Sequence, residues 1–204
     1  DKGQSLTEAL KNWHGLADNR SSCHYGFHMA ITDWNETTRS ELKTMKDSGV
    51  TSFKLYMAYD NLRSNDREIF EILEAVKTFG GLVSMHCENG DLVNALIAEQ
   101  KRQGRTSPAA HPLSRPDFVE AEAVNRFLAL AEAAESPVYV VHLSTERGLA
   151  ECLNARRRGQ KVFIETCPQY LLLDDSCYEL EGFESAKYVF APPARKPSDE
   201  KALW

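Results

Sequence analysis

Val50-Thr51-Ser52-Phe53-Lys54-Leu55-Tyr56-Met57-Ala58-Tyr59 is the segment from which the architecture can be worked out. It is rich in β-branched and aromatic residues and is bounded by a Ser-Gly pair and a polar Asp-Asn turn, which predicts a buried β-strand. Its one charged residue is Lys54, and lysine is almost never fully buried unless its charge is compensated or lost. Lys54 can reach solvent from the strand end, or it can supply a neutral amine for chemistry. The rest of the chain has to separate these two interpretations.

Strands of this kind alternate with helices along the chain. Further strands are predicted over 25–31, 82–86, 137–142 and 161–166. Helices are predicted between them from capping residues and apolar spacing, among them 5–17 after a Ser5 cap, 65–79 after a cap at Ser64-Asn65-Asp66, and 117–135 after a capping signal at Ser114-Arg115-Pro116-Asp117. This alternation predicts the α/β class with a parallel sheet, organised as a single domain over residues 1–204.

Composition limits the partners and the compartment. Of the 204 residues, 42% are hydrophobic and 26% charged, and the net charge is -6, as in a globular protein that binds neither nucleic acid nor a membrane. The one basic run, 156–158, suits the end of a helix. The five cysteines, an odd number without CxxC spacing, argue against a disulfide framework and favour the cytoplasm: Cys23, Cys87, Cys152, Cys167 and Cys177.

Lys54, His86 and His142 each lie in or at the carboxyl end of a predicted parallel strand. Active sites of parallel α/β folds form at that edge of the sheet. A single histidine there is more often packed or hydrogen-bonded than a ligand, but two on neighbouring strands beside a buried lysine favour a metal site. Imidazole ligands suit zinc, and other first-row metals also fit them. A neutral lysine amine can also add CO2, and the resulting carbamate can bridge two cations. His24 and His28 are too far apart along a strand to chelate one ion, and we interpret both as structural.

Five motifs, in this order, resemble those of the dihydropyrimidinase/hydantoinase family of cyclic amidohydrolases. They are Ser52-Phe53-Lys54-Leu55-Tyr56-Met57-Ala58-Tyr59, Met85-His86-Cys87-Glu88-Asn89, Val141-His142-Leu143-Ser144, Glu165-Thr166-Cys167-Pro168-Gln169-Tyr170-Leu171 and Ala191-Pro192-Pro193-Ala194-Arg195. The intervals between the Lys54, His86 and His142 motifs also match those of the family. The resemblance runs from about Tyr25 to Trp204 and covers the middle of a family member.

The resemblance implies a parallel (β/α)8 TIM-type barrel, of which this chain supplies the middle strands and helices. It implies two divalent metal ions, most often zinc, bridged by a carboxylated Lys54 and a hydroxide, with His86 and His142 as ligands of one of them. Tyr59 would hydrogen-bond the substrate carbonyl and the developing oxyanion, and Ala191 would occupy a position that contacts the substrate through its backbone. The substrate would be a small cyclic amide, a dihydropyrimidine or a 5-substituted hydantoin, and the enzyme a homo-oligomer, a dimer or tetramer.

The chain departs from the family pattern at several positions. The His-x-His pair of the first strand and the Asp of the last strand have no counterpart among these residues. His24 stands where many members carry Asp, and Ala191 where many carry Ser, which bears on specificity. Residues 198–204 start a helix of about two turns with nothing after it, so we expect an excerpt of a longer protein that is inactive when isolated.

Two alternatives remain open. The nearer one is an allantoinase-like or dihydroorotase-like cyclic amidohydrolase, although the motifs around Lys54 and Cys167 look closer to the hydantoinase side. The other is a non-catalytic barrel paralogue that acts as a scaffold, and the presence of all three candidate ligands argues against it.

Overall fold

The computed structural model describes residues 3–204, and within that range five strands form one parallel sheet. The strands are β1 (Met29–Ala30), β2 (Ser52–Tyr56), β3 (Leu82–His86), β4 (Val138–Val140) and β5 (Val162–Ile164). Their order in the sheet is their order in the chain, β1-β2-β3-β4-β5, and every neighbouring pair is parallel. The predicted α/β class with a parallel sheet is therefore confirmed.

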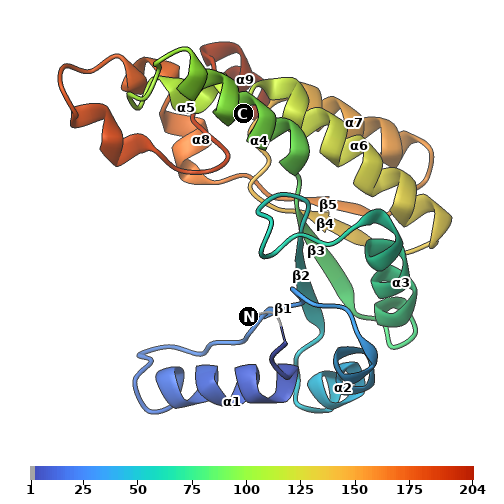
Figure 1. Ribbon diagram of the computed structural model, residues 1–204. Coiled ribbons are helices and arrows are strands. Elements are labelled where there is room, and N and C mark those ends of the chain that lie inside the picture. Colours follow the sequence, from blue (N-terminus) through green and yellow to red (C-terminus); the bar gives the residue numbers. More distant parts are fainter. Residues whose placement is uncertain (1–2) are drawn as a thin grey trace.

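Helices connect the strands. They are α1 (Leu6–Ala17), α2 (Glu36–Asp47), α3 (Asp66–Lys77), α4 (Gly90–Arg102), α5 (Ala110–Leu113), α6 (Asp117–Ala133), α7 (Glu146–Arg157), α8 (Pro168–Leu172) and α9 (Pro197–Leu203), with 3-10 helices η1 (Asp175–Tyr178) and η2 (Glu184–Tyr188). In Figure 1 the sheet lies in the middle, α1 and α2 lie below it, α3 to its right, and α4 to α9 above. No helix in the described part of the chain combines the length and the apolar character needed to cross a membrane.

The two faces of the sheet have different surroundings. Along β2, Phe53 and Leu55 are fully buried, whereas Ser52, Lys54 and Tyr56 on the opposite face are partly exposed. The buried face packs against helices, and its core includes Ile69, Ile72, Leu73 and Val76 of α3 and Val124, Phe127 and Leu128 of α6. The other face borders an open cavity of about 360 Å³. Lys54 therefore lies on the face of the sheet that the helices of this chain leave uncovered.

Capping residues set several helix starts as the sequence predicts. Ser5 accepts a hydrogen bond from the Glu8 amide, and Asn65 makes a reciprocal capping box with Glu68 at the start of α3. Asn89 caps α4 by accepting a hydrogen bond from the Leu92 amide. The caps of α3 and α4 fix where each of these helices begins after the preceding strand.

Two local predictions were wrong, and one short helix was not predicted. The strand expected over 25–31 is reduced to Met29–Ala30, because only these two residues pair with β2. The capping signal before α6 is not used: Pro116 is the first flanking residue, and Ser114 instead donates to the His111 carbonyl at 2.7 Å. Residues 110–113 form a separate short helix, α5, that the sequence did not indicate.

Candidate active site

His86 and His142 meet at the carboxyl ends of β3 and β4. His86 is the last residue of β3, and His142 follows β4 by two residues. Their side chains touch, with 3.0 Å between His86 Nδ1 and His142 Nε2. Burial lowers the pKa of both histidines, that of His142 to about 3, and the positive charge of Lys54 lowers both further. Both imidazoles are therefore neutral at pH 7, the form that can donate a lone pair to an electrophile.

Lys54 lies on the same face of the sheet as His86. Tyr56 is the register partner of His86 in the neighbouring strand, and Lys54 precedes Tyr56 by two residues, so the side chains of Lys54 and His86 point to one side. Burial lowers the pKa of Lys54 to about 8, although the nearby Cys87 and Glu165 groups oppose that shift. Roughly one molecule in ten therefore carries a neutral amine at pH 7, compared with fewer than one in a thousand for an ordinary lysine.

Two polar atoms in this cluster have no hydrogen-bond partner among residues 3–204. They are Lys54 Nζ and His142 Nδ1, and both are buried. Buried polar atoms are nearly always paired, so unpaired ones require an explanation such as a bound ion or a chemical modification. The described residues contain no ready-made group of three or more His, Cys, Asp and Glu side chains that could hold a metal ion. The donor set present is two neutral imidazoles and one amine that carbamate formation would turn into an anion, which fits a divalent cation.

The backbone of His142 is held in an uncommon conformation. Its φ is +40°, in the left-handed region that costs free energy for a residue other than glycine. Glu165 at the end of β5 supports this turn, since its Oε1 accepts from the His142 amide at 3.3 Å and its backbone carbonyl accepts from the Leu143 amide at 2.7 Å. Tyr139 donates its hydroxyl to the other carboxylate oxygen of Glu165 at 2.9 Å. The neighbouring strand thus fixes the direction in which His142 points.

Tyr59 lies beside the histidine pair. Its ring centroid is 5.1 Å from that of His86, and its φ of +69° places it at a tight turn. The Tyr59 carbonyl accepts from the amides of Leu62 and Arg63, both at 2.8 Å, and this closes the turn. We call residues 57–65, between β2 and α3, the Tyr59 loop. Burial raises the pKa of Tyr59, so its phenol stays protonated at neutral pH and can donate a hydrogen bond.

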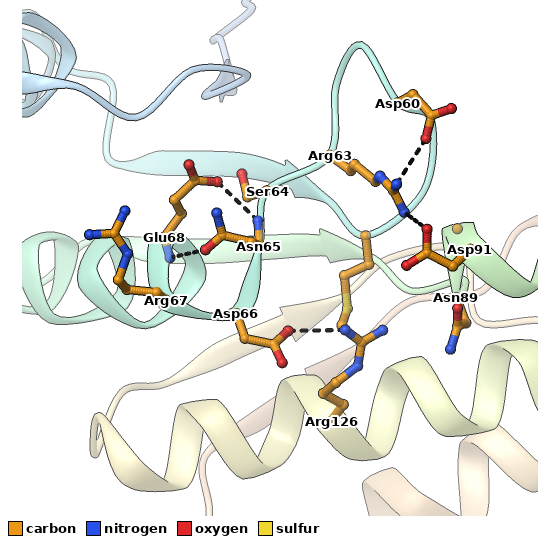
Figure 2. A pocket seen from close by; sticks show the side chains of 12 residues that line it. Asp60, Arg63, Ser64, Asn65, Asp66, Arg67, Glu68, Asn89, Asp91 and Arg126 are labelled. Atoms are coloured by element: carbon orange, nitrogen blue, oxygen red, sulfur yellow. Dashed lines mark hydrogen bonds and ion pairs between the residues drawn. The ribbon is translucent and has the colours of Figure 1, made fainter.

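A polar crevice of about 700 Å³ lies on the outer side of the Tyr59 loop, and none of Lys54, His86 and His142 lines it. Figure 2 shows Arg63 bridging two acidic residues across it. Its guanidinium is 3.1 Å from Asp60 of the loop and 2.7 Å from Asp91 in the first turn of α4. These ion pairs tether the Tyr59 loop to α4 and so help to position Tyr59. The crevice itself contains none of the site residues.

Gly90, the first residue of α4, allows this close packing. A Cβ at this position would lie 2.9 Å from Ala58 Cα and 2.9 Å from the Met57 carbonyl oxygen. Gly90→Ala is therefore expected to push the Tyr59 loop outward, destabilise the protein by about 1–3 kcal/mol and lower its turnover. Urea denaturation and steady-state kinetics would measure both effects. Gly15→Ala in α1 is the matched control, because a Cβ there meets nothing within 4 Å, and equal effects of the two variants would contradict the expectation.

Several buried charged residues behind the site were not recognised as functional from the sequence. Glu88 accepts from His86 at 2.9 Å between Nε2 and Oε2 and also pairs with Arg115. Further along, Arg195 donates to Ser144 Oγ at 2.9 Å, and Ser144 donates to Glu120 at 2.8 Å. The one available signal was the position of Glu88 and Ser144, each two residues after a strand-end histidine.

Ala191 lies at the start of a segment that the rest of the fold holds in place. It is partly exposed and precedes the buried segment 192–195. This segment is anchored on both sides: Tyr170 donates its hydroxyl to the Pro192 carbonyl at 2.7 Å, and Arg195 reaches Ser144. The structure therefore brings Lys54, His86, His142 and Tyr59 together and holds Ala191 at the end of an anchored segment.

The fold and this site define a class: a parallel α/β protein whose functional groups converge at the carboxyl ends of adjacent strands. No family model matches the chain. Individual proteins do. The chain is 44% identical to the D-hydantoinase of Ralstonia pickettii, 42% to that of Rhizobium radiobacter and 40% to that of Geobacillus stearothermophilus. Each match covers the whole of this chain, and the chain spans about 45% of the length of these relatives.

Solved structures give the same result. A D-hydantoinase structure superposes with a TM-score of 0.98 at 42% identity, and the dihydropyrimidinase from Brevibacillus agri with 0.98 at 39%. Both cover the whole of this chain and 45% of theirs. The L-hydantoinase from Arthrobacter aurescens is more distant, with a TM-score of 0.88 at 28% identity over 98% of this chain and 44% of its own. The whole of this chain is thus homologous to about 45% of the length of hydantoinases and dihydropyrimidinases, the family that its motifs resemble.

Proposed function

We propose that the protein carrying this chain hydrolyses a cyclic amide, a 5-substituted hydantoin or a dihydropyrimidine, to an N-carbamoyl amino acid. The observation that carries the proposal is the contact of two neutral histidines at the carboxyl edge of the sheet, beside a lysine whose amine is buried and a protonated tyrosine. The printed names of the relatives, D-hydantoinase and dihydropyrimidinase, indicate the substrate class.

Divalent metal ions, with zinc the preferred one, are part of this proposal. His86 and His142 would ligate through ring nitrogens, and Lys54 through the oxygens of a carbamate formed by adding CO2 to its neutral amine. The unpaired Lys54 Nζ and His142 Nδ1 support such a ligand. Bound there, the metal would polarise the ring carbonyl and lower the pKa of a bound water.

The residues of this chain would orient the substrate and hold its charge. Tyr59, protonated and beside His86, would donate a hydrogen bond to the carbonyl oxygen and to the oxyanion that develops on it. The hydrogen bond from His86 to Glu88 leaves Nδ1 of His86 as the ligating atom.

A substrate panel tests the proposal. We expect the full-length, zinc-loaded protein to open hydantoin and dihydrouracil rings faster than allantoin or dihydroorotate. The reverse preference would favour the allantoinase or dihydroorotase alternative, and a protein that binds no metal and opens no ring would be a scaffold. For the 204-residue chain alone we expect at most weak metal binding and no turnover, because it lacks the His-x-His and Asp ligands of the family.

Tyr59→Phe is expected to lower kcat by about 10²–10³-fold with a smaller change in KM, since a hydrogen bond to the oxyanion strengthens in the transition state. The phenyl ring preserves the packing on His86 and leaves the φ of +69° as it is. Tyr25→Phe, at an exposed tyrosine hydrogen-bonded to Asp18, is the control and should keep full activity. An unchanged kcat in Tyr59→Phe would remove Tyr59 from the reaction.

A further inference from the structure

Glu88 and Arg115 form a buried ion pair directly behind the site, and the reaction proposed above assigns neither a role. Glu88 is fully buried and Arg115 is 7% exposed. A buried ion pair costs free energy to desolvate and often adds little to stability, so its presence calls for another explanation. Its position between two site residues supplies one.

Glu88 fixes the tautomer of the His86 ring. Its Oε2 lies 2.9 Å from His86 Nε2, and a carboxylate can only accept, so Nε2 carries the proton and Nδ1 keeps its lone pair. Arg115 pairs with the same carboxylate oxygen, so the group accepts from both partners. The lone pair of His86 Nδ1 therefore points at His142.

Arg115 contacts the second site residue as well. Its guanidinium carbon lies 5.7 Å from the centre of the Tyr59 ring, within range of a cation–π interaction. The same guanidinium pairs with Glu88 through Nη1. One rigid, planar group thus touches both Tyr59 and the carboxylate that orients His86.

The backbone of Arg115 is held in place from a third direction. Its carbonyl accepts from Arg195 Nη1, and Arg195 in turn donates through Nε to Ser144 Oγ at 2.9 Å. Ser144 lies two residues beyond His142 and is fully buried, with Glu120 as its acceptor. Arg115 is therefore anchored to the His142 segment through its main chain and to His86 and Tyr59 through its side chain.

We propose that Arg115 is a positioning residue that couples the orientation of His86, through Glu88, to the placement of Tyr59. The inference rests on the proposed function, because it gives these two residues their roles as metal ligand and oxyanion donor. Its consequence is that one residue supports both the proposed metal ligand His86 and the proposed oxyanion donor Tyr59.

Cobalt(II) titration of the metal-free full-length protein tests the His86 half of the proposal without using activity. We expect Arg115→Met and Glu88→Gln to weaken cobalt binding by about 10–100-fold and to change the visible cobalt spectrum. Arg115→Lys, which keeps the charge, should bind more tightly than Arg115→Met. If Arg115→Met does not fold, Glu88→Gln and Arg115→Lys carry the test. Wild-type cobalt affinity and spectrum in these variants would overturn the proposal.

A double-mutant cycle tests the Tyr59 half. Arg115→Met is expected to lower kcat while KM changes less. The loss of kcat in the double variant Arg115→Met/Tyr59→Phe should be smaller than the two single losses combined, because both substitutions act through the phenol of Tyr59. Fully additive losses would overturn the coupling.

Two control variants separate positioning from general stability. Leu73→Ala, in the core of α3, should lower the Tm without altering the cobalt spectrum. Arg126→Met removes an arginine that pairs with Asp66 and Glu122 away from the site and should leave cobalt binding unchanged. A wild type that binds cobalt but opens no cyclic amide would defeat the proposed function alone, whereas normal cobalt binding by Arg115→Met in an active enzyme would defeat the positioning role alone.

Discussion

His142→Asn in the full-length protein is expected to abolish binding of one metal ion and to lower kcat/KM by at least about 10³-fold, roughly 4 kcal/mol of transition-state stabilisation. Asn is chosen because it tolerates the left-handed backbone that His142 adopts at φ +40°, so the loss reports on the imidazole and not on the turn. Metal content by elemental analysis and hydantoin hydrolysis would be measured together.

His111→Asn is the matched control for this variant. His111 is partly buried and bonds the Phe190 carbonyl through Nε2 at 2.6 Å, and it takes no part in the site. It should cost stability but retain the full metal content and turnover. Full metal content in His142→Asn would show that the imidazole is not a ligand and would remove the main support for hydrolysis at this edge of the sheet.

Lys54→Met is expected to abolish turnover and, at the same time, to stabilise the metal-free protein by about 1–3 kcal/mol at pH 7. The folded protein holds the pKa of Lys54 near 8, whereas the unfolded chain has the ordinary value of 10.5. Below pH 8 lysine is protonated in both states, and the folded state bears the full cost of burying the charge. Methionine fills a similar volume without that cost.

The stability difference between the wild type and Lys54→Met should depend on pH. Between pH 8 and about 10.5 the unfolded state binds more protons than the folded state, so the stability of the wild type rises with pH in this window. The advantage of Lys54→Met should therefore shrink from pH 7 to pH 10, as measured by urea denaturation of both proteins without metal. A variant that is less stable than the wild type at pH 7 would mean that Lys54 has a charge partner, which contradicts its unpaired Nζ.

The parts of the fold that local rules govern could be predicted from the sequence. The strand over 82–86 has the predicted bounds, since a Gly-Gly pair precedes it and a capping asparagine follows it. The strand over 25–31 was overestimated, because apolar alternation does not tell how many residues find a partner strand, and only Met29 and Ala30 do. Ser114 has the spacing of a helix cap, but its hydroxyl donates to the His111 carbonyl instead. It does so because Ser114 directly follows the short helix α5, which contains His111.

The candidate site, too, could be predicted only in part from the sequence. The contact of His86 and His142, at 3.0 Å, follows from their places at the carboxyl ends of neighbouring parallel strands. Lys54 lies in the middle of the adjacent strand β2, on the same face as His86. The ion pair of Glu88 and Arg115 could not be foreseen, because a charged residue in a loop is usually exposed and only tertiary packing shows that these are buried. The family resemblance of the motifs is confirmed over the whole chain, and the roles of the site residues stay predictions until the variants are measured.

The strand order has a consequence for how the protein folds. Because each strand pairs with the next one in the chain, and a helix intervenes every time, every contact across the sheet closes a loop of tens of residues; the two histidines alone are 56 residues apart. The chain loses the conformational entropy of closing each loop before the strand pairing can stabilise it. Such topologies therefore fold slowly. We therefore expect Lys54, His86 and His142 to come together only after the strands that carry them have paired.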